Sequence, residues 1–166
     1  METAYIGLGS NKGDRMENLK RAVASIGNDG WTEVVDLSPV YLTTPVGVSG
    51  HPDYYNAVIK IHTHYPVHEL LDMLETIERE LGRKEKGDLK PREIDIDILL
   101  YGREIIKHNR VTVPHTRLKE RAFALKPLLD IEPELKCPLT GEDYSSVLKR
   151  IHTGQKLEKI TGELAL

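Results

Sequence analysis

Residues 92 to 102 read REIDIDILLYG, and this stretch decides the fold. Acidic residues alternate with isoleucines from position 93 to position 98. Such alternation is typical of a β-strand that is buried on one face, because successive side chains of a strand point to opposite faces of the sheet. The stretch therefore predicts a strand over 93–101 that carries Glu93, Asp95 and Asp97 on one face.

The segments around this strand alternate between strand and helix patterns. The predicted elements are a strand over 3–9, a helix over 15–26, a strand over 31–43 broken at Pro39, a strand over 54–63, a helix between Pro66 and Gly82, and the strand over 93–101. This order predicts an α+β fold with a ferredoxin-like βαββαβ core. Extra helices are expected over 121–131 and 145–152, with an edge strand over 157–161, so that helices cover both faces in an α-β-α sandwich.

Length and composition indicate one small domain over 1–166. The chain has 166 residues, 39% hydrophobic and 30% charged, with a formal net charge of −3. Proteins that coat nucleic acid or anionic membranes are usually basic, so neither partner is expected. The single cysteine, Cys137, allows no disulfide within the chain and indicates a reducing compartment. Neither a secretory signal nor an apolar run of roughly 20 residues is present, so we expect a cytoplasmic protein.

The two aspartates of the strand are candidates for a metal site. At about 3.3 Å rise per residue, Asp95 and Asp97 are expected to lie roughly 6.5 Å apart on one face. Two carboxylates at this spacing repel each other unless a positive charge offsets them. A solvent-facing strand with salt bridges explains the pattern in many proteins. Here the pair fits Mg²⁺ ions shared with substrate phosphates, because Mg²⁺ commonly takes one or two carboxylates plus phosphate oxygens.

A basic loop directly precedes the strand. It spans 83–92 and includes Arg83 and Arg92, with five cations against two anions. Charged loops are most often simply solvated. Beside two aspartates, however, this loop has the composition of a triphosphate site, because arginine binds phosphate oxygens bidentately.

The sequence YYN at 54–56 is a candidate recognition site for a flat heterocycle. Tyr54 and Asn56 share one strand face, whereas Tyr55 points to the other. An aromatic ring supplies stacking, and an amide supplies both a donor and an acceptor. Taken alone, the pattern favours core packing as the role of the tyrosine.

Several motifs together resemble one enzyme family. They are AYIGLGSNKGDR, YLTTPVG, DYYNAVIKI, IERELGR, PREIDIDILLYG and VTVPHTRLKERAFALKPLLDI, in this order. They resemble the 6-hydroxymethyl-7,8-dihydropterin pyrophosphokinases (diphosphokinases) of folate biosynthesis, from about residue 4 to residue 135. The resemblance implies a ferredoxin-like α-β-α sandwich. It also implies that the enzyme transfers pyrophosphate from ATP to the pterin hydroxymethyl group and releases AMP.

The resemblance also implies roles for individual residues. It implies that Asp95 and Asp97 hold two Mg²⁺ ions, and that Arg83 and Arg92 contact the transferred phosphates. The implied pterin contacts are Tyr54 and Phe123 on the two sides of the ring, with Asn56 and the backbone near Thr43, Thr44 and Val46 at its edge. The implied ATP contacts are Leu71, Glu78, Ile98, Val111, Thr112, His115 and Arg121. The implied partners are these two small molecules, acting on a monomer.

Two alternatives predict different partners. Another Mg²⁺-dependent enzyme, such as a nucleotidyltransferase, needs the aspartates and the basic loop but not a pterin pocket, and it releases pyrophosphate instead of AMP. A ferredoxin-like RNA-binding module is the non-catalytic alternative. The single phenylalanine, the net charge of −3 and the acids within a sheet strand argue against RNA binding.

Overall fold

The computed structural model describes residues 1–44, 50, 52–82, 93–151, 154–160 and 164. Within these ranges the protein has a mixed α/β fold built on an antiparallel sheet. The strands follow the order β5 (Asp95–Tyr101), β1 (Glu2–Ser10), β4 (Tyr54–Thr63), β3 (Tyr41–Thr43) and β8 (Leu157–Lys159), and β2 (Thr32–Leu37) also pairs with β4.

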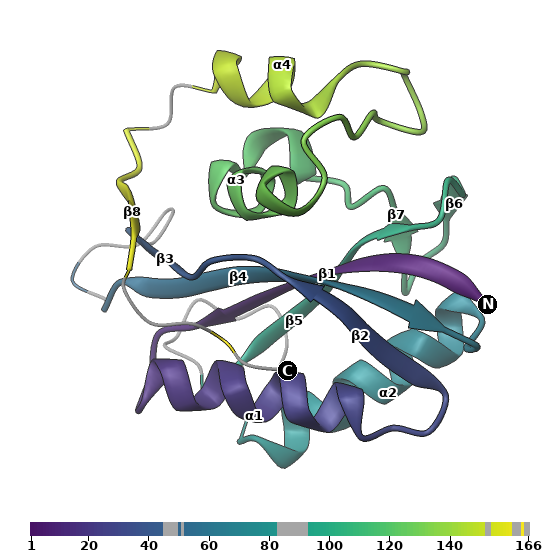
Figure 1. Ribbon diagram of the computed structural model, residues 1–166, viewed down its shortest axis with the longest axis vertical. Helices are drawn as coiled ribbons and strands as arrows, with labels where there is room; N and C mark the ends of the chain where they lie inside the picture. Colours follow the sequence, from purple (N-terminus) through teal and green to yellow (C-terminus); the bar gives the residue numbers. More distant parts are fainter. Residues whose placement is uncertain (45–49, 51, 83–92, 152–153, 161–163, 165–166) are drawn as a thin grey trace.

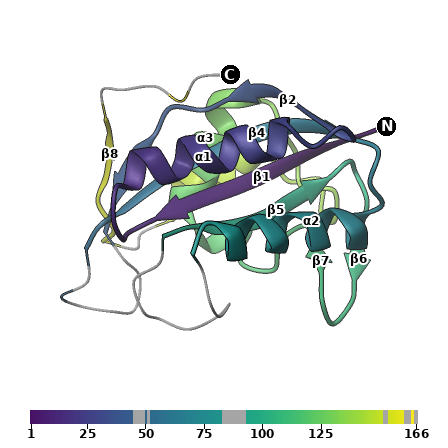
Figure 2. The same ribbon diagram turned by 90° about the horizontal axis from the view of Figure 1, so that it is seen from below.

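Among the described residues, four α-helices cover the two faces of this sheet and give three layers (Figure 1). Helices α1 (Arg15–Gly27) and α2 (Val67–Glu80) lie on one face, and Figure 2 shows them side by side. Helices α3 (Ala122–Ile131) and α4 (Tyr144–Arg150) lie on the other face. No helix in the described ranges is long and apolar enough to cross a membrane.

The helix α1 shows why the sequence folds this way locally. The Asp14 side chain caps the helix by accepting a hydrogen bond of 3.1 Å from the backbone N–H of Glu17. Leu19, Ala22 and Ile26 then recur at helical spacing, and each is 0% exposed. The predicted helices over 15–26 and 121–131 are confirmed.

The two faces of the sheet pack against different helices, and each carries a hydrophobic cluster. In β1, Ile6 and Leu8 face α1 and α2, whereas Gly7 and Gly9 face the opposite side. The register places Gly7 beside Asp97 of β5, and a shift follows between Tyr5 and Ile6. Because of this shift, Leu99 and Leu100 both pack in the core under α3 and α4.

The strand β5 begins at Asp95, two residues later than predicted. The neighbouring strand β1 ends at Ser10, so no ladder partner remains for Glu93. Glu93 instead lies 3.3 Å from the ammonium group of Lys12. Only Asp95 and Asp97 therefore form the acidic face of the strand.

The segment between β5 and α3 forms a small hairpin and a helical turn. The hairpin consists of β6 (Ile106–Lys107) and β7 (Thr112–Val113), and η1 (Leu118–Glu120) follows as a 3₁₀ turn. The hairpin lies beyond the edge strand β5, and η1 leads into α3 above the sheet (Figure 1). Residues that follow β5 in the sequence therefore return to the neighbourhood of Asp95 and Asp97.

Candidate active site

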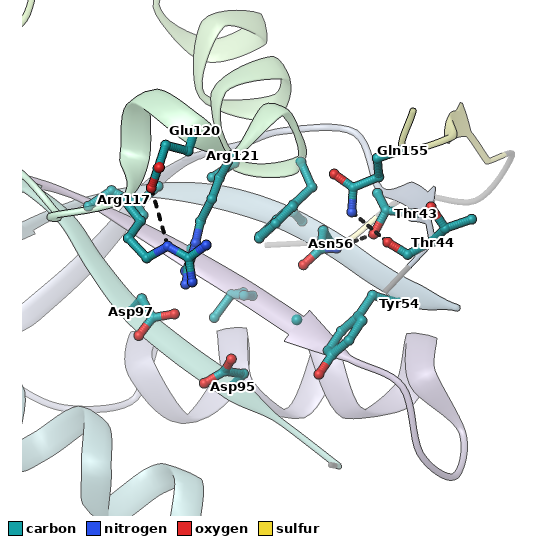
Figure 3. A pocket seen from close by; sticks show the side chains of 17 residues that line it. Thr43, Thr44, Tyr54, Asn56, Asp95, Asp97, Arg117, Glu120, Arg121 and Gln155 are labelled. Atoms are coloured by element: carbon teal, nitrogen blue, oxygen red, sulfur yellow. Dashed lines mark hydrogen bonds and ion pairs between the residues drawn. The ribbon is translucent and has the colours of Figure 1, made fainter. Parts of the chain in front are cut away.

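A cavity of about 200 Å³ opens on the sheet face that α3 covers only in part (Figure 3). Strands β1, β3, β4 and β5 form its floor, and the chain from Arg117 to Ala124 forms its opposite wall. The polar lining residues are Thr43, Thr44, Tyr54, Asn56, Asp95, Asp97, Arg117, Glu120, Arg121 and Gln155. We call this cavity the first pocket.

The floor of the first pocket depends on two glycines of β1. A Cβ atom on Gly9 would lie 2.8 Å from Asn56 Oδ1 and 3.4 Å from Tyr54 Cδ1. A Cβ atom on Gly7 would lie 3.3 Å from a methyl carbon of Leu99. The sequence GLG thus keeps open the space between the aspartates of β5 and the polar residues of β4.

Asn56 is held in one orientation at this floor. It is 7% exposed, and its Nδ2 donates a hydrogen bond of 2.6 Å to Thr43 Oγ1. The amide oxygen therefore lies over Gly9, inside the pocket. Tyr54 lies on the same strand face, two residues away. The arrangement predicted from YYN is present: an aromatic ring and an oriented amide line one cavity.

Phe123 lies on the opposite wall, where α3 begins. The Tyr41 hydroxyl, which donates to Asp130, and an ion pair between Lys60 and Glu132 connect α3 to the sheet. Burial and then the Asp130 contact raise the pKa of Tyr41, and Lys60 lowers the pKa of Glu132. These contacts fix the helix that carries Phe123.

Two arginines face the two aspartates across the first pocket. Figure 3 shows the side chains of Arg117 and Arg121 extending from the α3 side towards Asp97. Arg117 Nε lies 3.3 Å from a carboxylate oxygen of Glu120, and the Arg121 guanidinium lies 5.6 Å from the ring centre of Phe123. The pocket thus combines a carboxylate pair with guanidinium groups, which is the charge pattern of a site for metal-bound phosphates.

A second pocket, of about 440 Å³, lies on the other side of Asp97. Asp97 lines both pockets, so the two cavities meet at this residue. The β6–β7 hairpin forms one wall and α2 forms another. The lining residues are Leu71, Glu75, Asp97, Ile98, His108, Asn109, Arg110, Val111, Thr112, His115 and Thr116.

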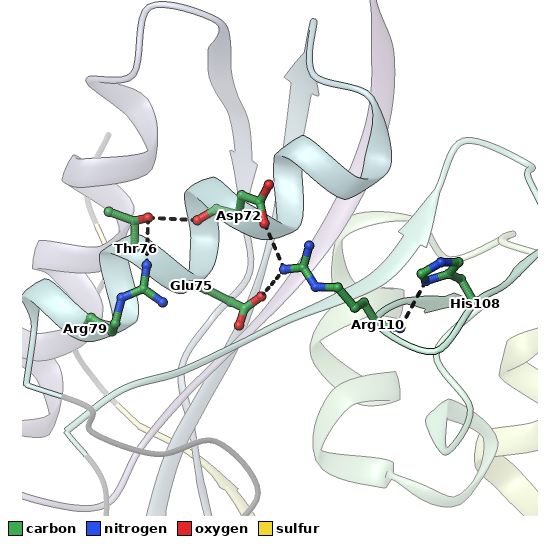
Figure 4. A network of polar contacts seen from close by, with 6 residues as sticks. All are labelled: Asp72, Glu75, Thr76, Arg79, His108 and Arg110. Carbon is green, nitrogen blue, oxygen red and sulfur yellow. Dashed lines mark hydrogen bonds and ion pairs between the residues drawn. The ribbon is translucent and has the colours of Figure 1, made fainter.

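Arg110 connects the hairpin to α2 at the edge of the second pocket (Figure 4). Its guanidinium lies 2.8 Å from Asp72 Oδ1 and 2.8 Å from Glu75 Oε1. These contacts raise the pKa of Arg110, the hydrogen bond to Asp72 most of all. Its backbone N–H donates to Nδ1 of His108, so the loop between β6 and β7 is held at both the backbone and the side chain.

Glu78 supports the aspartates from below. It is 3% exposed, and its Oε2 accepts a hydrogen bond of 2.8 Å from the backbone N–H of Ile96. Ile96 stands between Asp95 and Asp97, so this buried carboxylate fixes the backbone that carries both. Glu78 lines neither pocket.

The structure groups most of the predicted site residues into two sets. Thr43, Thr44, Tyr54, Asn56, Phe123 and Arg121 line the first pocket, whereas Leu71, Ile98, Val111, Thr112 and His115 line the second. Arg121, which the resemblance assigns to ATP, lies in the same pocket as the residues that it assigns to the pterin. Val46, Arg83 and Arg92 lie outside the described residues.

Sequence reasoning did not single out Gly7, Gly9, Arg117, Glu120 and Gln155 as site residues. The spacing of Arg117 and Arg121 was a usable signal, because positions four apart in a helical turn can face one way. Gln155 is more than a hundred residues from Thr44 in the chain, and nothing in the local sequence indicated their contact.

The aspartate pair fits magnesium held jointly with a polyphosphate. Among the described residues, no three His, Cys, Asp or Glu side chains gather into a metal site. Asp95 and Asp97 therefore offer two carboxylates and not a complete cage. Mg²⁺ in nucleotide enzymes takes such a pair and completes its shell with phosphate oxygens and water.

Two pockets that meet at one acidic residue offer adjoining space for two small molecules. The family model described as 7,8-dihydro-6-hydroxymethylpterin-pyrophosphokinase (HPPK) matches residues 5–133. A 2-amino-4-hydroxy-6-hydroxymethyldihydropteridine pyrophosphokinase of Haemophilus influenzae is 43% identical over 138 residues, which are 83% of this chain and 86% of that protein. The chain belongs to the 7,8-dihydro-6-hydroxymethylpterin-pyrophosphokinase family.

Other relatives are longer than this chain. The folic acid synthesis protein fol1 of Pneumocystis carinii is 41% identical over 150 residues, which are 90% of this chain but 20% of that protein. A crystal structure described as HPPK-DHPS in complex with substrates superimposes with a TM-score of 0.71 at 14% identity. The match covers 89% of this chain and 43% of that one, and it supports the fold alone.

Proposed function

We propose that the two pockets are the two substrate sites of the family's reaction, in which pyrophosphate passes from ATP to the hydroxymethyl group of 6-hydroxymethyl-7,8-dihydropterin and AMP is released. In this proposal the pterin occupies the first pocket and ATP occupies the second. The carrying observation is that Asp97 lines both pockets. A phosphate chain that starts in the second pocket can therefore reach an acceptor hydroxyl in the first.

The first pocket has the chemistry that a pterin ring needs. Tyr54 and Phe123 come from opposite walls and can stack on the two sides of a flat ring. Asn56, already oriented by Thr43, presents an amide oxygen to the donor groups at the ring edge. Because these groups are in place before the ligand binds, little ordering cost falls on recognition.

The second pocket suits a nucleotide base next to a charged phosphate chain. Leu71, Ile98 and Val111 supply apolar surface for the base. We assign His115, a basic residue that lines this pocket, to the phosphates. We assign Arg83 and Arg92 to the phosphates as well, from the sequence alone.

We assign Asp95 and Asp97 to two Mg²⁺ ions. When bound, Mg²⁺ would neutralise phosphate charge and orient the phosphate chain, in which the P–O bond to AMP breaks as the P–O bond to the pterin hydroxyl forms. The residues of the chain then supply position and charge. Arg117 and Arg121 face the aspartates and can stabilise the charge that develops on the transferred group. Glu78 keeps the aspartate backbone in place.

We further propose that residues 1–166 form one pyrophosphokinase domain with a ferredoxin-like core. The strand order β5-β1-β4-β3, with α1 and α2 on one face, supports this topology. Helices α3 and α4 cover the face that RNA-binding modules of this topology leave open for stacked bases, which disfavours the RNA-binding alternative.

An AMP-release assay tests the proposal. With ATP, Mg²⁺ and 6-hydroxymethyl-7,8-dihydropterin, the purified chain is expected to form one AMP for each pterin consumed. Release of free pyrophosphate in place of AMP would identify a nucleotidyltransferase and contradict the proposal. Replacement of Asp95 by alanine is expected to lower the rate by about 10²-fold or more, without loss of folding, because a carboxylate that we assign to Mg²⁺ is removed and phosphate charge in the transition state is less well neutralised.

A further inference from the structure

The first pocket is completed by a segment outside the part of the chain that matches the family. The match ends at residue 133, whereas Gln155 lines the pocket. Gly154, with a φ of 68°, turns the chain just before it. The strand β8 then pairs with β3, placing Leu157 beside Thr43. The C-terminal segment therefore forms the edge of the sheet next to the predicted pterin contacts.

Three hydrogen bonds from this segment converge on Thr44. Gln155 Nε2 donates to the backbone oxygen of Thr44. The backbone N–H of Lys156 donates to Thr44 Oγ1 over 3.2 Å, and the backbone oxygen of Lys156 accepts from the Thr44 N–H over 3.3 Å. The N–H, the carbonyl and the hydroxyl of Thr44 are thus all bonded to two consecutive residues. This fixes the peptide planes on both sides of Thr44.

Gln155 is the member of this group whose side chain faces the cavity. Figure 3 shows it beside Thr43 and Thr44, close to Asn56. Thr43 in turn accepts a hydrogen bond from Asn56. A continuous series of contacts therefore runs from Gln155 through Thr44 and Thr43 to Asn56, which is the amide that we assign to the pterin edge.

We propose that Gln155 is a positioning residue for pterin recognition, acting by orienting the Thr44 peptide at the edge of the first pocket. The inference rests on the proposed function, because the ligand of that pocket is taken to be the pterin. It goes further in assigning part of the specificity to the C-terminal segment that precedes β8. ATP binding is independent of Gln155, because Gln155 does not line the second pocket.

Two substitutions test this role. Gln155→Ala removes the donor, and Gln155→Glu keeps the size but places a carboxylate against the Thr44 carbonyl. Binding of 6-hydroxymethylpterin is titrated with Mg²⁺ and a non-hydrolysable ATP analogue present, and the ATP analogue is titrated separately. Loss of one neutral hydrogen bond predicts about fivefold weaker pterin binding for the alanine variant, and more for the glutamate variant, with ATP binding unchanged. The KM for pterin rises accordingly while kcat stays within about twofold.

Glu158→Ala is the matched control, because Glu158 is an exposed residue of β8, three positions after Gln155, and does not line the first pocket. It is expected to bind both ligands as the unmodified chain does. Equal pterin affinity of the unmodified chain and both Gln155 variants would overturn the inference. Parallel losses of pterin affinity, ATP affinity and unfolding temperature would also overturn it, because they indicate a purely structural role. Failure of the unmodified chain to bind the pterin would instead refute the proposed function, and this inference with it.

Discussion

The two pockets meet at Asp97 but are built in different ways. The first pocket is cut into the sheet itself, where glycines of β1 leave room and Asn56 is fixed by a buried hydrogen bond. The second pocket is formed by a hairpin that is held against α2 by Arg110, whose side chain is 47% exposed. The close-packed sheet backbone cannot shift to make room for an added side-chain atom, whereas a hairpin held by surface ion pairs can shift. Substitutions in the first pocket should therefore have the larger effects.

The junction between the pockets should be the most sensitive position. Asp97→Asn keeps the shape of the side chain but removes its charge, which both sites share. We expect kcat for AMP release to fall by about 10²- to 10³-fold, because the carboxylate that we assign to Mg²⁺ is lost, and with it the neutralisation of phosphate charge in the transition state. Glu33→Gln, which removes one negative charge from an exposed position of β2, is the control and should be fully active. Near-normal turnover of Asp97→Asn would show that the charge of Asp97 is not needed by either site, and it would contradict the role of Asp97 as their junction.

The floor of the first pocket should tolerate no added carbon. In Gly9→Ala the new methyl group would lie 2.8 Å from Asn56 Oδ1, and Asn56 cannot move away without losing its bond to Thr43. We expect pterin affinity to fall by about tenfold or more, with ATP affinity retained. Gly30→Ala is the matched control, because a Cβ there meets nothing within 4 Å. Calorimetric titration of both ligands into both variants distinguishes the outcomes, and unchanged pterin affinity in Gly9→Ala would show that the ligand lies elsewhere.

The aromatic wall should contribute less than the floor. Phe123→Leu retains apolar volume but removes the flat ring. Aromatic pairs contribute about 0.5–1.5 kcal/mol beyond burial, so we expect roughly three- to tenfold weaker pterin binding. Fluorescence titration with 6-hydroxymethylpterin measures this directly. Leu139→Ala, at an exposed position away from both pockets, should bind as the unmodified chain does. A larger loss of affinity for ATP than for pterin would show that Phe123 contacts ATP, and it would contradict the assignment of Phe123 to the pterin.

The smallest effect is expected at the hairpin. Arg110→Ala releases the loop between β6 and β7 from Asp72 and Glu75. Exposed ion pairs contribute about 0–1 kcal/mol each, so we expect the KM for ATP to rise by about two- to fivefold and the KM for pterin to stay constant. The unmodified chain should lose part of this difference at high salt, because salt screens exposed charges. A change of 10²-fold in turnover would show instead that Arg110 acts in the chemical step.

Local patterns in the sequence predicted the sheet and those site residues that are close together in the sequence. Contacts between residues far apart in the sequence could not be predicted. The alternation in β5 correctly placed Asp95 and Asp97 opposite Ile96 and Ile98, because strand geometry alone determines it. The register shift that turns Leu99 and Leu100 to the same core depends on pairing with β1 and has no local signal.

The same distinction explains the site residues. Tyr54 and Asn56 share a strand face, so their proximity follows from spacing. Gln155 reaches Thr44 only through the pairing of β8 with β3, and Glu78 reaches Ile96 only because α2 packs beneath β5. Side-chain burial and long-range pairing decide such contacts, and neither is encoded in a short stretch of sequence.

A crystal structure of the chain with Mg²⁺, a non-hydrolysable ATP analogue and 6-hydroxymethylpterin tests the central claim most directly. We predict the pterin between Tyr54 and Phe123, the base beside Val111, and the phosphate chain passing Asp97 from one pocket to the other. A structure in which both ligands share one pocket, or in which Asp97 contacts neither ligand nor metal, would contradict the account.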